Sequence, residues 1–159
     1  MNLGRAEEIE FEIKHIVRTN KVNKLFDLIS AMDIVLKERE LGGCFGAYIF
    51  IQRNRTILLN SSLSESHKKV VLAHEVCHAI FHKDTRQICA YSFFQNEVEK
   101  EANYGAVVLL HELGVWQSED FTVKTLDVTK KDKGIEEACG QWYLNHMCGG
   151  ISNGCKKKR

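Results

Sequence analysis

The stretch "VVLAHEVCHAIF" at residues 70–81 constrains the fold more than any other part of the chain. If the segment is a helix, its apolar side chains point to most sides of it instead of forming one stripe. These residues are Val70, Val71, Leu72, Ala73, Val76, Ala79, Ile80 and Phe81. A helix that is apolar on most sides is buried, so other elements must pack against several of its faces. The preceding "SSLSES" supplies N-cap residues, and the pattern predicts a helix that ends near Phe81 or His82.

Two histidines and a glutamate interrupt this apolar helix. Because residues four apart lie on one helix face, the imidazoles of His74 and His78 can reach one ion and occupy two corners of a tetrahedron. Glu75 is rotated by about 100° from His74, so it can lie beside a water molecule at that ion, where a general base belongs. Burying three such groups is costly unless they are paired or bind a metal. The pattern therefore favours a zinc site over an ordinary buried helix.

The four-residue spacing continues to His82, but this residue is not expected to bind the same ion. Along a continuous helix, His82 lies about 12 Å beyond His74. No glycine stands between His78 and His82 to break the helix there. We predict that His82 caps the helix or contacts a metal ligand without binding the metal itself.

A third protein ligand must come from elsewhere, and the acidic run "EVEKEAN" offers three carboxylates. Glu99 shares a helical stripe with Asn103 and with the apolar face, so it is the preferred ligand. Asn103 could accept the free N–H of a ligand histidine and fix its tautomer. Glu101 can also point inward and remains the alternative. Glu97 stands near the start of the helix, where a carboxylate is favourable to the helix dipole.

The rest of the pattern predicts one α+β domain over residues 1–150 and a flexible basic tail over 151–159. Helical spacing indicates N-terminal helices within 1–32. "GAYIFIQ" and "TILLN", joined by "RNR", indicate a small antiparallel sheet within 33–60, with 34–38 as a possible third strand. The site helices occupy 64–114, and a C-terminal helical part occupies 115–150.

Composition excludes several classes of protein. The formal net charge of +1 gives no field that would attract nucleic acid, so direct DNA binding is not expected. The chain lacks an apolar run long enough to span a membrane and a recognisable signal peptide, so we expect a cytoplasmic protein. In that compartment cysteines stay reduced. Thiols are therefore expected at all of them: Cys44, Cys77, Cys89, Cys139, Cys148 and Cys155.

The segments "ILLNSSLSESHKKVVLAHEVCHAIFH" and "EVEKEANYGAVVLL" resemble the ImmA/IrrE-type metallopeptidases. The similarity covers roughly residues 25–115. The sequence departs from the family pattern in three places. Cys77 stands where the family usually has glycine, Gly105 replaces a phenylalanine, and no proline follows the double leucine.

The resemblance implies a zincin-like fold, with a small sheet packed on the helix that carries H-E-x-x-H. It also implies a gluzincin-like site that holds one Zn²⁺ per chain. His74 and His78 would then be ligands, Glu75 the general base, Glu99 the third ligand, and Asn103 its neighbour outside the ligand shell.

The same resemblance implies bacterial or phage proteins, often from mobile elements, that cleave or inactivate a partner transcriptional repressor. We therefore expect a zinc-dependent endopeptidase that makes limited cuts in such a partner. The alternative is a zinc-stabilised binding module that regulates the partner without cutting it. A structural zinc is closed by four protein ligands. The sequence offers three good ligands and no convincing fourth, which favours catalysis.

Overall fold

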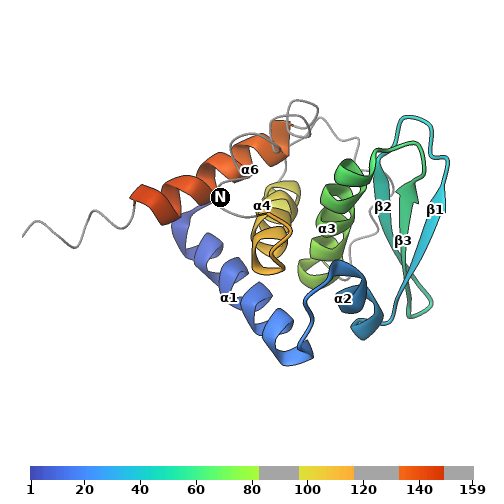
Figure 1. The fold of residues 1–159 in the computed structure, drawn as a ribbon, viewed down its shortest axis with the longest axis horizontal. Coiled ribbons are helices and arrows are strands. Elements are labelled where there is room, and N and C mark those ends of the chain that lie inside the picture. The colour runs from blue at the N-terminus through green and yellow to red at the C-terminus, as the bar shows by residue number, and fades with distance from the viewer. Residues whose placement is uncertain (83–96, 117–132, 149–159) are drawn as a thin grey trace, which may run out of the picture.

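The computed structural model of this 159-residue chain describes residues 1–82, 97–116 and 133–148. These ranges form an α+β fold, as predicted, in which a small sheet packs on one side of a group of helices (Figure 1). The elements, in chain order, are α1 (Leu3–Asn20), α2 (Leu25–Ala31), β1 (Ile34–Arg39), β2 (Gly46–Ile51), β3 (Asn54–Asn60), α3 (Glu65–Phe81), α4 (Glu97–Glu112), α6 (Lys133–Tyr143) and the π-helical η1 (Leu144–Cys148).

Helix α3 lies between the sheet and helices α1, α4 and α6, and α2 packs beside β1 (Figure 1). Strands β2 and β3 pack on one side of it and α4 packs on another. Every residue from Val70 to Ile80 is buried, which confirms the prediction of a helix enclosed on most sides. The helix begins where the cap residues predicted it, because the Ser64 hydroxyl accepts the backbone N–H of His67 at 3.4 Å.

The sheet has the order β1-β3-β2. Strands β2 and β3 are antiparallel and are joined at Gln52 and Arg53, which have positive φ values of 51° and 65°. Such values suit a two-residue hairpin turn. Strand β1 runs parallel to β3, so the prediction of a wholly antiparallel sheet is wrong for this pair. The chain does turn back after β1, but β3 inserts between β1 and β2. Alternation within a strand does not reveal which neighbour it pairs with.

The connection between β1 and β2 is fastened to the end of β3 by Asn60, whose side chain is buried. Its amide nitrogen donates to the carbonyls of Gly42 and Cys44 at 3.2 and 2.7 Å. Its oxygen accepts the backbone N–H of Ser62 at 3.0 Å. These bonds satisfy backbone groups of an irregular segment beside the sheet.

The cysteines only partly follow the prediction. Cys77 and Cys139 are free buried thiols, as expected. Cys44 is disulfide-bonded, so the prediction of thiols throughout is wrong at this position. A disulfide requires two Cα atoms within about 7 Å of each other in the folded chain. Spacing along the sequence does not reveal that proximity.

The helical predictions are confirmed in outline. Helices α1 and α2 account for the N-terminal pair, and α1 and α6 both pack on α4. Gly114 has φ 65° just after α4, as a helix C-cap glycine does. No helix in the described ranges has the length and apolarity needed to cross a bilayer. The predicted tail at 151–159 lies outside the described residues. The single-domain boundary stays a prediction.

Two of the departures from the family pattern meet in space, at the contact of α3 with α4. A Cβ atom added to Gly105 would lie 2.8 Å from the Cys77 Sγ and 3.2 Å from a ring atom of Phe81. The thiol of Cys77 therefore occupies space that a side chain at position 105 would need. A larger residue on one helix is matched by a smaller one on the other, which lets the two helices approach closely.

We expect Gly105→Ala to lower the free energy of unfolding by about 1–3 kcal/mol through overpacking, although alanine favours a helix by about 1 kcal/mol. Cys77→Ala should relieve the clash, because it removes the sulfur that the new Cβ meets. Urea denaturation of wild type, both single variants and the double variant measures this coupling. Equal costs of Gly105→Ala in both backgrounds would contradict the proposed contact.

Candidate metal centre

Three side chains from α3 and α4 converge on one point. His74 Nε2 and His78 Nε2 lie 2.9 Å apart. The carboxylate oxygens of Glu99 lie 3.3 Å from His74 Nε2 and 3.5 Å from His78 Nε2. A zinc tetrahedron with bonds of about 2.0–2.1 Å has edges of about 3.3–3.4 Å. The separations between these nitrogens and the two carboxylate oxygens are close to such edges, and one ligand atom from each residue lies within 4.8 Å of the others. Among the described residues this is the group of histidine, cysteine or acidic side chains that could hold a metal.

Asn103 fixes the orientation of the His74 ring by contacting Nδ1, the ring nitrogen that does not face His78 and Glu99. The amide oxygen of Asn103 lies 2.8 Å from His74 Nδ1, and both side chains are buried. Because an amide oxygen only accepts, the ring nitrogen Nδ1 must carry the hydrogen. In the neutral ring, Nε2 then carries the lone pair, and this nitrogen lies toward His78 and Glu99. Asn103 thus contacts one histidine of the pair, and its role in supporting a metal ligand stays a prediction.

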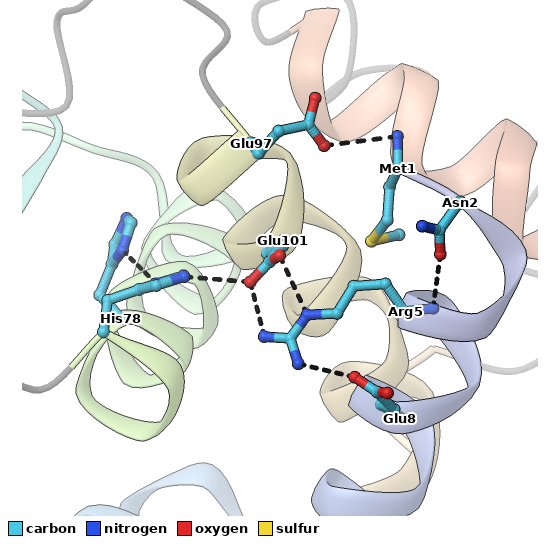
Figure 2. A network of polar contacts seen from close by, with 8 residues as sticks. Met1, Asn2, Arg5, Glu8, His78, Glu97 and Glu101 are labelled. Atoms are coloured by element: carbon cyan, nitrogen blue, oxygen red, sulfur yellow. Dashed lines mark hydrogen bonds and ion pairs between the residues drawn. The ribbon is translucent and has the colours of Figure 1, made fainter.

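The two candidate carboxylates face different partners. Glu99 points to the histidine pair. Glu101 is turned toward Arg5 of α1 (Figure 2), with which it makes an ion pair of 2.7 Å. Its carboxylate also lies 3.2 Å from His82 Nε2. The geometry thus favours Glu99 over Glu101 as the third ligand, and the ligand role itself stays a prediction.

His82 stands outside the converging group but beside it. It is the C-cap of α3, and its backbone N–H donates to the carbonyl of His78 at 2.9 Å. Its ring nitrogen Nδ1 lies 3.2 Å from His78 Nδ1. His82 therefore contacts the side of the His78 ring that faces away from Glu99, which is consistent with a supporting position.

Glu75 lies against the sheet, and its side chain is almost entirely buried. Burial, and to a smaller extent the charge of Glu99, raise the pKa of Glu75 to about 7. His74 and a hydrogen bond from the backbone N–H of Tyr48 on β2 act in the opposite direction. A carboxyl group with a pKa near neutrality can both accept and release a proton at physiological pH.

Gly46, at the start of β2, provides the room for this carboxylate, and sequence reasoning missed it. A Cβ atom there would lie 2.7 Å from a methyl carbon of Val71 and 3.2 Å from Glu75 Oε1. The strand can approach α3 only because position 46 lacks a side chain. A glycine within a strand pattern signals close backbone approach, so the signal was present in "GAYIFIQ".

The neighbouring ionisable groups are held neutral by burial. Burial, followed by the charges of His74 and His82, lowers the pKa of His78 to about 2, so the ring is neutral. Burial also raises the pKa of the Cys77 thiol, which keeps it protonated. The Cys77 Sγ lies toward Gly105 rather than toward the histidine pair. A thiolate ligand at this position is therefore not supported.

Comparison with protein-family models matches residues 30–114 to Peptidase_M78, described as the IrrE N-terminal-like domain. The matched range contains the sheet, α3 and α4, and with them all three converging side chains. Helix α1 lies outside it. A comparison with curated proteins found no match.

The pKa of Glu75 predicts a pH-dependent instability of the metal-free protein. Its folded value of about 7 exceeds the ordinary 4.5, so the folded state holds the proton more tightly. The free energy of unfolding should therefore fall as pH rises from about 4.5 to 7, by about 3 kcal/mol at about 1.4 kcal/mol per pKa unit. The free energy of unfolding of Glu75→Gln should not show this fall. The difference between the variant and wild type should therefore shift in favour of the variant when the pH is raised from 4.5 to 8.

Urea denaturation after chelation at both pH values measures this difference. The control is Glu65→Gln, because Glu65 is an exposed carboxylate on the same helix. This variant should follow wild type at both pH values. If the free energies of unfolding of wild type and Glu75→Gln differ by the same amount at the two pH values, burial does not raise the pKa of Glu75.

Proposed function

Because the chain belongs to the Peptidase_M78 family of IrrE N-terminal-like domains, we propose that it is a zinc-dependent endopeptidase that makes limited cuts in a partner protein. The family implies a metallopeptidase-like domain. The observation that carries the proposal is the convergence of His74, His78 and Glu99 next to the buried carboxylate of Glu75. One zinc ion per chain would occupy this group.

The donor atoms support zinc as the metal. Two imidazole nitrogens and one carboxylate oxygen are ligands that Zn²⁺ accepts, and one such atom from each of the three residues lies within 4.8 Å of the others. Lone pairs and negative charge converge within 3.5 Å in a largely buried region. Such an arrangement is unfavourable without a cation, because neighbouring acceptors repel one another.

Each residue of the site can have a separate role in peptide hydrolysis. Zinc, when bound, polarises the scissile carbonyl and lowers the pKa of a water molecule to about 7. Glu75 takes the proton of the attacking water and passes it to the leaving amine. The backbone N–H of Tyr48 holds the Glu75 carboxylate from the sheet side. Asn103 keeps the lone pair of His74 Nε2 directed at the metal position.

The number of protein ligands separates catalysis from a purely structural role. A structural zinc site is closed by four protein ligands, whereas a catalytic one keeps one position for water. In the described ranges the group has three members. A binding module would also have no use for a buried Glu75 that costs stability at neutral pH. Costly buried groups are typical of sites whose function requires them, which favours the enzyme over the non-enzymatic alternative.

The partner is proposed from the family resemblance and from the position of the sheet edge. In the part of the chain that the structure describes, strand β2 is at an edge of the sheet and lies against α3 beside Glu75. An extended segment of a partner could add to this edge and present one peptide bond to the site. We propose a transcriptional repressor of a phage or mobile element as that partner, and hence a cytoplasmic location. Neither a nucleic acid nor a membrane is proposed as a direct partner.

The test compares wild type, Glu75→Gln and Glu65→Gln for bound zinc and for cleavage of the repressor encoded beside the gene. Glu75→Gln should retain zinc but lose cleavage by about 10²–10⁴-fold, because it cannot accept the proton. Glu65→Gln should behave as wild type. Elemental analysis gives the zinc content, and mass spectrometry identifies the cut.

Each other outcome points to a different failure. Undiminished cleavage by Glu75→Gln would remove Glu75 from the role of base. If wild type holds zinc and binds the repressor without cutting it, the regulatory binding module is the better description. A wild type that binds no zinc would contradict the metal site itself.

A further inference from the structure

A chain of polar contacts leads from the rear of the His78 ring to helix α1. His78 Nδ1 lies 3.2 Å from His82 Nδ1, and His82 Nε2 lies 3.2 Å from Glu101 Oε2. Arg5 of α1 donates hydrogen bonds to both oxygens of the Glu101 carboxylate, from Nε at 3.0 Å and from Nη2 at 2.7 Å (Figure 2). Arg5 lies outside the range that matches the family, whereas the other three residues lie within it.

Hydrogen-bonding capacity gives this chain of contacts one direction. A carboxylate only accepts, so His82 Nε2 must carry a hydrogen and donate it to Glu101. A neutral imidazole has one N–H and one lone pair, so His82 Nδ1 accepts the N–H at Nδ1 of His78. His78 Nε2 is then left with its lone pair, on the side where His74 and Glu99 lie. The carboxylate at one end thus selects the metal-binding tautomer at the other.

The Arg5 guanidinium is held in place rather than free in solvent. It donates to Glu8 at 3.1 Å, and its centre lies 5.9 Å from the centroid of the Phe81 ring. The side chains of His82 and Glu101 are 9% and 17% exposed. Paired N–H bonds to a carboxylate are geometrically specific. They fix the position of the Glu101 oxygens as well as neutralising their charge.

We propose that Arg5 is a positioning residue for the metal ligand His78, acting through Glu101 and His82. The proposal rests on the zinc site proposed above and extends it to a helix outside the family-matched segment. In this role α1 helps to complete the metal centre, because it supplies the cation that orients the chain of contacts. The competing explanation is that Arg5 and Glu101 only fasten α1 to α4.

The structure offers a matched control for that competing explanation. Tyr104 of α4 donates its hydroxyl hydrogen to Glu10 of α1 at 2.6 Å. This bond also joins α1 to α4, but it does not touch His82 or His78. Tyr104→Phe therefore weakens the same helix contact without interrupting the path to the metal position.

The experiment measures zinc affinity by competition with a chelator, and the visible absorption of the Co²⁺-loaded protein as a report of ligand geometry. Arg5→Met should weaken zinc binding by about tenfold, the lower end of the range for residues that support metal ligands. It should also alter the Co²⁺ spectrum. His82→Phe should weaken binding at least as much, and Tyr104→Phe should leave both readouts unchanged.

The double variant provides the decisive comparison. In the His82→Phe background, Arg5→Met should cause no further loss of zinc affinity, because the path is already interrupted. Arg5→Lys retains the charge but not the paired bonds, so it should give an intermediate affinity. It replaces Arg5→Met in every comparison if circular dichroism shows that Arg5→Met does not fold.

Three results would overturn the proposal while leaving the zinc site intact. They are an unchanged affinity in Arg5→Met, an equal loss in the His82→Phe background, and a comparable loss in Tyr104→Phe. A wild-type protein that binds neither zinc nor cobalt would instead overturn the proposed function, and this inference with it.

Discussion

The convergence of three hydrogen-bond acceptors inside the protein is the constraint on which the rest of the structure depends. His74, His78 and Glu99 bring two imidazole nitrogens and a carboxylate within 3.5 Å of one another, and with neutral imidazoles this is unfavourable in a region with little water unless a cation is present. Helices α3 and α4 must therefore be held firmly in register. Their close approach at Gly105 and Cys77 meets this demand, because one side chain fills the space that the other leaves.

The same core contains Glu75, whose burial costs stability at neutral pH but suits it to the proposed role of general base. Burial against β2 raises the pKa of this carboxyl group to about 7, where it can exchange protons near neutral pH. Gly46 makes the burial possible by letting the strand approach the helix. The sheet thus serves the site in two ways, since it excludes water from Glu75 and places an edge strand beside it.

The sequence was sufficient for what local periodicity controls. A four-residue spacing places two imidazoles on one helix face whatever surrounds the helix, and an apolar run on most sides requires burial. The boundaries of α3 and the C-cap glycine at Gly114 follow from similarly local rules. The family resemblance agreed with Glu99 as the expected third ligand and implied the proposed peptide hydrolysis.

Only the tertiary structure decided between elements far apart in the chain. Glu99 faces the histidines and Glu101 faces Arg5, although both carboxylates could point inward on the helix considered alone. The parallel pairing of β1 with β3 and the disulfide at Cys44 likewise depend on which segments meet after folding. Periodicity fixes the direction of a side chain relative to its own helix or strand. Tertiary packing decides which residue the side chain meets in that direction. Arg5, for example, contacts Glu101 although it lies 96 positions earlier in the chain.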